Sequence, residues 1–128
     1  VEIYDASSNS WSTKTFSQPQ TQYSPAALDN KIYLAGGYIS TFGADYIFSD
    51  VVHIYDVITN TWSSTTMSKP KALMTAVGLD GKIFWAGGFD SSWADAIHDY
   101  VRLVNDVEIY DINTGSHSHH FFSSNAYI

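Results

Sequence analysis

Three histidines near the C-terminal end of the chain come nearest to metal chemistry in their type and spacing: His117, His119 and His120. On a strand, His117 and His119 would share one face and His120 would lie on the other. Two neutral imidazoles can begin a zinc or copper site, but a third ligand with set geometry is needed. We therefore expect no metal and no cofactor, and we interpret the cluster as part of a polar outer strand.

Patterns of catalytic residues are otherwise absent. The sequence contains no cysteine, which removes disulfides, thiolate zinc sites and cysteine nucleophiles. It also contains no Gly-x-Ser-x-Gly elbow, no His-Glu-x-x-His pair and no phosphate-cradling glycine loop. The sequence therefore leans away from an enzyme.

Aromatic and acidic residues gather in two long segments between predicted strands, residues 38–50 and 89–106. Connections of this length tend to be functional or disordered, and aromatics with acids resemble a recognition surface for a protein segment or a glycan. The alternative, of equal weight, is that the aromatics form small local cores and the acids are solvated. The predicted partner-binding residues are Tyr38, Phe42, Asp45, Tyr46, Phe48, Phe89, Asp90, Trp93, Asp95, His98, Asp99, Tyr100 and Arg102, with Lys69 and Lys71 from a neighbouring connection.

The charge of the chain excludes two classes of partner. A net charge of −7 argues against the nucleic-acid backbone, which requires clustered Lys and Arg, and against an anionic membrane surface. No run of about 18 apolar residues exists, so we expect no membrane insertion. The sequence does not fix the compartment, although charged residues make up only 15% of it, which leans toward an extracellular or periplasmic setting.

The elements that must position these loops are revealed by an internal repeat. The motif of residues 1–5, Val-Glu-Ile-Tyr-Asp, returns in related form at residues 52–56 and 107–111. Residues 1–37 and 52–88 share 17 identities without a gap. Such self-similarity at a fixed period is the mark of a repeat architecture.

Each repeat is predicted to be built of short strands. In the complete unit the apolar runs cover residues 23–28, 31–36, 51–55 and 60–64, separated by turn residues such as Asp29-Asn30. Four antiparallel strands at a period near 50 residues make one blade of a propeller. We therefore predict an all-β fold, with the strands of each blade lettered a to d.

The chain resembles the kelch family of β-propellers. The family's hallmarks are a Gly-Gly pair that closes strand b, then a Tyr, and a Trp seven residues after the Tyr. The matching residues are Gly36, Gly37, Tyr55 and Trp62, together with Tyr4, Trp11, Gly87, Gly88 and Tyr110, while His117 stands at the third Trp position. All nine matches have a structural interpretation: the glycines admit positive φ and close backbone approach, and the aromatics fill the wedge between blades.

The resemblance implies an incomplete ring. Residues 1–22 are interpreted as a half blade, strands c and d with a linker. Residues 23–73 form a complete blade, and residues 74–128 form a second blade with a long b–c loop. Each copy holds more c–d pairs than a–b pairs, so self-association cannot close a ring. We expect a longer parent polypeptide with six or seven blades, or another chain that supplies the rest.

A non-catalytic scaffold is the function that the sequence favours. Its long b–c and d–a loops would present one face to a protein partner, with a glycan as the second candidate ligand. One alternative is a carbohydrate-active or copper-dependent kelch enzyme whose catalytic residues lie largely outside this segment. The other is a structural repeat in an extracellular or filament assembly.

Overall fold

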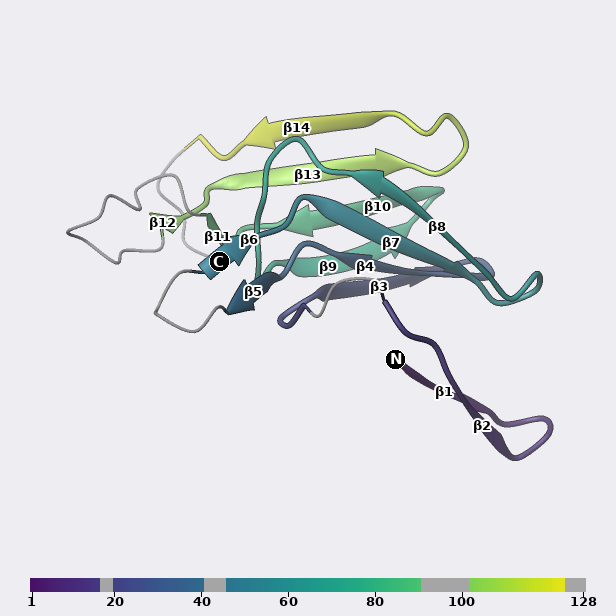
Figure 1. Ribbon diagram of the computed structural model, residues 1–128. Coiled ribbons are helices and arrows are strands. Elements are labelled where there is room, and N and C mark those ends of the chain that lie inside the picture. Colours follow the sequence, from purple (N-terminus) through teal and green to yellow (C-terminus); the bar gives the residue numbers. More distant parts are fainter. Residues whose placement is uncertain (17–19, 41–45, 91–101, 124–128) are drawn as a thin grey trace.

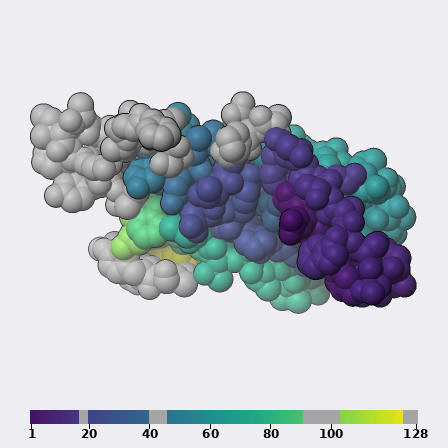
Figure 2. All heavy atoms as spheres, turned by 60° about the horizontal axis from the view of Figure 1, so that its bottom comes forward, coloured from purple at the N-terminus to yellow at the C-terminus, as the bar shows by residue number. Residues whose placement is uncertain are grey.

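The computed structural model describes residues 1–16, 20–40, 46–90 and 102–123, and these residues form strands and turns (Figure 1). The strand Glu2–Asp5 (β1) pairs with Ser10–Thr13 (β2) in a hairpin. Hairpin β1–β2 lies at one end of the molecule (Figure 2). Among the described residues, no helix is long and apolar enough to cross a membrane.

Two four-stranded antiparallel sheets form the body of the structure. In each sheet the strands are hydrogen-bonded in chain order, which is the a-b-c-d arrangement of a propeller blade. The all-β prediction is therefore confirmed, and within the described residues the sheets do not close a ring. The first sheet contains Ser24–Leu28 (β3), Lys31–Ala35 (β4), Val51–Asp56 (β7) and Thr61–Thr66 (β8); the second contains Thr75–Leu79 (β9), Lys82–Ala86 (β10), Asp106–Asp111 (β13) and His117–Phe121 (β14).

Each b–c connection carries a small hairpin of its own. Tyr38–Ser40 (β5) pairs with Tyr46–Phe48 (β6), and Phe89–Asp90 (β11) pairs with Arg102–Leu103 (β12). Both small hairpins lie at the same end of the sheets, opposite the c–d turns (Figure 1). The two long connections are thus brought together at one face, which we call the loop face.

The core lies between the two sheets, where β3 packs against β9. Trp85 is fully buried there and donates its indole N–H to the Ser24 carbonyl at 3.1 Å. The Ser24 hydroxyl accepts the Met74 N–H at 2.8 Å, so this serine serves both sheets. A large apolar ring with a satisfied polar edge can stabilise the contact without leaving a buried donor unpaired.

The c–d turns show why the Tyr and Trp positions repeat. In the first sheet, Asp56 Oδ1 accepts the backbone N–H groups of Ile58 and Thr59, and these bonds lower the Asp56 pKa. The Tyr55 hydroxyl donates to Asn60 Oδ1 at 2.7 Å, and its ring lies 5.0 Å from that of Trp62. Hairpin β1–β2 repeats this arrangement with Tyr4, Asn9 and Trp11.

The third turn departs from the pattern at two positions. Gly115, with φ +71°, takes the left-handed position that Asn9 and Asn60 occupy elsewhere. His117 replaces Trp and stacks on Tyr110 with ring centroids 4.6 Å apart. A flat ring is therefore kept against the tyrosine although the residue type has changed.

The repeated Tyr and Trp side chains, which we predicted to pack between blades, differ in how far they are buried. Tyr55 is 6% exposed, and Trp62 is contacted by Phe16 from the linker before its sheet. Trp11, in hairpin β1–β2, is 68% exposed.

The Gly-Gly pair brings strand b against the linker that enters the next blade. Gly36 and Gly37 have φ of +66° and +92°, and Gly37 donates its N–H to the Lys71 carbonyl at 3.0 Å. A Cβ on Gly36 would collide with this same carbonyl. Both the backbone conformation and the close approach therefore require glycine here.

We predict that Gly36→Ala destabilises the full-length protein by more than about 2 kcal/mol, because it combines a left-handed penalty with a backbone clash. Gly115→Asn is the matched control, since Asn occupies this conformation in two other turns and an added Cβ meets nothing within 4 Å. It should change stability by no more than about 0.5 kcal/mol. Urea unfolding midpoints measure both, and equal effects would contradict the argument.

Candidate functional site

The loop face carries an apolar pocket of about 220 Å³, lined by Tyr38, Tyr46, Phe48, Leu73 and Phe89. Tyr38 packs edge-on to Tyr46 with ring centroids 5.0 Å apart. The lining comes from both small hairpins and from the linker that joins the two blades. The pocket is therefore a feature of the junction and not of one loop.

Backbone pairing holds the lining in place. Tyr38 exchanges two hydrogen bonds with Thr21 of the linker before its blade, each 3.0 Å long. Phe89 exchanges an equivalent pair with Ala72 of the next linker. Because each b–c loop is tied to the preceding linker, Leu73 is carried to the edge of the pocket beside Phe89.

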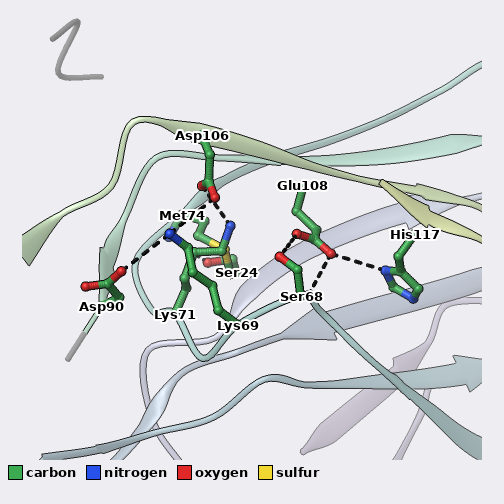
Figure 3. A network of polar contacts seen from close by, with 9 residues as sticks. All are labelled: Ser24, Ser68, Lys69, Lys71, Met74, Asp90, Asp106, Glu108 and His117. Atoms are coloured by element: carbon green, nitrogen blue, oxygen red, sulfur yellow. Dashed lines mark hydrogen bonds and ion pairs between the residues drawn. The ribbon is translucent and has the colours of Figure 1, made fainter. Parts of the chain in front are cut away.

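Beneath the loop face lies a buried cluster of charges (Figure 3). Lys71 is 0% exposed and donates to Asp106 Oδ1 at 3.0 Å. Lys69 Nζ lies 3.4 Å from Asp90 Oδ2 and 3.4 Å from Asp106 Oδ2. Two lysines and two aspartates thus neutralise one another, as burial of charge requires.

Glu108 is a further buried carboxylate, on the same strand as Asp106, β13 (Figure 3). Its two oxygens accept the backbone N–H of Ser68 at 2.9 Å and the Ser68 hydroxyl at 2.6 Å. His117 Nδ1 lies 3.5 Å from Glu108 Oε1, and its Nε2 is 3.0 Å from the Thr65 hydroxyl. The serine donates to the carboxylate and not to the imidazole, so the three residues do not have the Ser–His pairing of a Ser-His-Asp triad.

The junction between the first sheet and the linker before it has aromatic side chains at the equivalent positions. His53 occupies the place of Glu108, and its ring stacks on Phe16 at 4.6 Å. Phe16 also packs edge-on to Trp62, and Tyr23 lies beside His53. Burial lowers the pKa of His53 below its ordinary value, because the charged imidazolium is disfavoured among these rings.

The structure brings together four of the predicted partner-binding residues: Tyr38, Tyr46, Phe48 and Phe89 all line the pocket. It places Lys71 and Asp90 in the buried cluster instead, because each finds an opposite charge there. We expected Lys71 on an exposed loop. The structure instead buries its side chain. Lys69 is partly exposed, and Arg102 lies on β12. The remaining predicted residues, Phe42, Asp45, Trp93, Asp95, His98, Asp99 and Tyr100, lie outside the described residues.

Leu73 is the pocket residue that the sequence did not indicate. It has a φ of +58°, a conformation that is rare for leucine, and its side chain is 50% exposed. Gln22 has the same conformation at the equivalent position of the preceding linker. The repeat alignment of the two linkers could have marked this position, since Gln22 to Leu73 and Thr21 to Ala72 are the two places where a polar residue changes to an apolar one.

The three C-terminal histidines, His117, His119 and His120, all lie on β14. His117 faces Glu108 and Thr65, whereas His119 packs against Phe121. Within the part of the chain that the structure describes, no group of three or more His, Asp or Glu side chains is arranged to hold a metal.

Comparison with known proteins gives two matches. A sequence model of the kelch motif matches residues 21–66 and 70–119, which together cover most of the chain and both four-stranded sheets. The chain is also similar to the Kelch-like protein terF of Aspergillus terreus, with 32% identity over 75 residues, or 57% of this chain. It spans 16% of the length of that relative.

We predict that Lys71→Gln destabilises the full-length protein by about 3 kcal/mol, because it leaves buried Asp106 without its closest cation. The chain offers a matched control: Gln20 and Val51 stand at the equivalent positions of the preceding junction. The double variant Lys71→Gln, Asp106→Val should therefore be more stable than either single variant. Denaturant unfolding of the wild type, the two single variants and the double variant gives the coupling free energy between residues 71 and 106. Additive changes in the free energy of unfolding would refute the pairing.

We also predict that His53 makes stability fall as the medium becomes acidic. Its folded-state pKa lies below the ordinary value of 6.5, so its contribution is complete above pH 6.5 and is lost as the pH falls through the lowered pKa. His53→Phe should flatten the fall in thermal midpoint between pH 6.5 and 5, and the exposed His120→Gln serves as control. Parallel pH profiles for wild type and His53→Phe would exclude this origin.

Proposed function

Because this chain belongs to the kelch-repeat family, we propose that it serves as a protein-interaction scaffold and presents its loop face to a partner. Kelch repeats commonly form propellers that bind other proteins, and the scaffold is rigid while the loops vary. The observation that carries the proposal is the apolar pocket. Exposed apolar hollows on such a face mark sites of interaction.

The fold supports this role through the way in which it supplies the pocket. Residues from two b–c loops and one linker meet there, and each loop is tied by paired backbone hydrogen bonds to its neighbouring linker. A binding surface held by backbone pairing loses little conformational entropy when a partner arrives. The aromatic lining also matches the residue types that dominate binding energy at interfaces.

The test uses the full-length protein and its own partner, identified by cross-linking and then purified. We expect the triple variant Tyr46→Ala, Trp93→Ala, Tyr100→Ala to weaken binding by more than about tenfold, because interface aromatics carry much of the energy. A matched variant at the opposite face, Ser7→Ala, Ile58→Ala, Asn113→Ala, alters only c–d turns and should change affinity less than about twofold. Titration calorimetry compares them, and undiminished binding by the first variant would reject the proposed function.

A further inference from the structure

The second sheet has an apolar face that is turned away from the first sheet. Trp85 on β10 bonds to Ser24 of the first sheet, so the side chains that alternate with Trp85 lie on the opposite face. Cross-strand pairing places the neighbours of these side chains on β9 and β13 on the same face. This far face consists of Val77, Leu79, Phe84, Ala86, Val107 and Ile109. Val77 and Leu79 are 54% and 58% exposed, and the other four are half-buried.

The first sheet shows what such a face contacts. Its equivalent side chains are Tyr33, Ala35, Val52 and Ile54, which are at most 7% exposed because the second sheet packs on them. The far face repeats these residue types, with Phe in place of Tyr and with Ala, Val and Ile unchanged. A surface that repeats a buried interface in position and in residue type fits the same kind of partner, which is another four-stranded sheet.

The residue at the start of each linker indicates the chemistry of the sheet that follows. Before the first sheet, the ring of Phe16 stacks on that of His53 at 4.6 Å. Before the second sheet, Met67 stands in place of Phe16, and Glu108 stands in place of His53. A phenyl ring gains contact from a flat ring, whereas a carboxylate buried against it would lose water and gain no hydrogen-bond donor from the phenyl group.

The linker that leaves the second sheet is of the aromatic type. Phe122 donates its N–H to the Asn105 carbonyl at 2.8 Å, as Met67 does to the Asp50 carbonyl at 2.8 Å. Phe122 therefore holds the position of Met67 in the repeat, but its residue type is that of Phe16. The sheet that this linker enters should meet Phe122 with a ring.

We propose that the far face docks a further kelch sheet of the same polypeptide, and that this sheet presents a ring side chain to Phe122 where the second sheet has Glu108. The inference goes beyond the proposed function, since it concerns a face built from β9, β10 and β13 and not the loop face. It names both the partner of the face and the chemistry of the junction between them.

The first experiment asks whether the far face is covered in the full-length protein. Val77→Thr should lower the thermal midpoint by about 3 °C or more, because a covered hydroxyl replaces a methyl group in an apolar contact. Val57→Thr is the matched control: Val57 is 53% exposed, on the β7–β8 turn, and the same change there should shift the midpoint by less than about 1 °C. Equal shifts for the two variants would overturn the inference.

The second experiment identifies what covers the face. The photoreactive residue p-benzoylphenylalanine replaces Val77 in the full-length protein, and mass spectrometry maps the cross-link. We expect a link, within one polypeptide, to a strand of a sheet that has the Gly-Gly and Tyr positions of the repeat. The same replacement at Ile58, which is 73% exposed, should give no link to that sheet. A link only to a second copy or to a different protein, or no link, would overturn the inference.

The third experiment tests the ring. Phe122→Ala should lower the thermal midpoint by about 5 °C or more, whereas Phe121→Ala, at a residue that is 56% exposed, should lower it by less than about 2 °C. In the cross-linked sheet, the residue that aligns with His53 should carry a ring, and its replacement by Ala should add little once Phe122 is Ala. A carboxylate at that position, or additive effects, would contradict the proposed junction.

Discussion

The approach of Gly36 and Gly37 to the Lys71 carbonyl is the constraint on which the rest of the structure depends. It fixes the linker that leaves one blade and enters the next, and so it sets the distance between the sheets. The same linker carries Lys69 and Lys71 into the buried charge cluster and Leu73 to the pocket. A side chain on Gly36 would therefore disturb the core and the loop face together.

The two successive junctions show that one backbone arrangement accepts unlike side-chain chemistry. Before the first sheet, the equivalent positions hold the rings of Phe16, His53 and Trp62. Before the second, they hold Met67, Glu108 and His117, and the neighbouring Ser68 donates two hydrogen bonds to Glu108. Buried ion pairs seldom add stability over apolar packing, but they penalise a wrong neighbour strongly. The polar junction thus ties the second sheet to the linker before it through directional hydrogen bonds.

The loop face combines rigidity with an incomplete apolar surface. Paired backbone bonds at Thr21 and Ala72 hold the aromatic lining, while Leu73 and Tyr46 remain exposed to water. A monomeric surface gains nothing from this exposure. The lysines below the face are bound within the chain, so their charge is not offered to a ligand. The loop face therefore presents a rigid apolar hollow, while the described charges beneath it are paired with one another.

The sequence by itself determined the strands of the two four-stranded sheets, their order and the repeat, because turn residues, alternation and the Gly-Gly, Tyr and Trp positions act over a few neighbouring residues. It did not indicate the small hairpins β5–β6 and β11–β12 within the b–c connections. It also identified four of the five pocket residues from the aromatic content of the loops. Only the tertiary structure decided that Lys71 is buried, since this residue lies in a linker and its partner Asp106 lies 35 residues away on β13. Leu73 was missed for the same reason: its φ and its exposure follow from the path of the linker between two sheets, and no local pattern encodes that path.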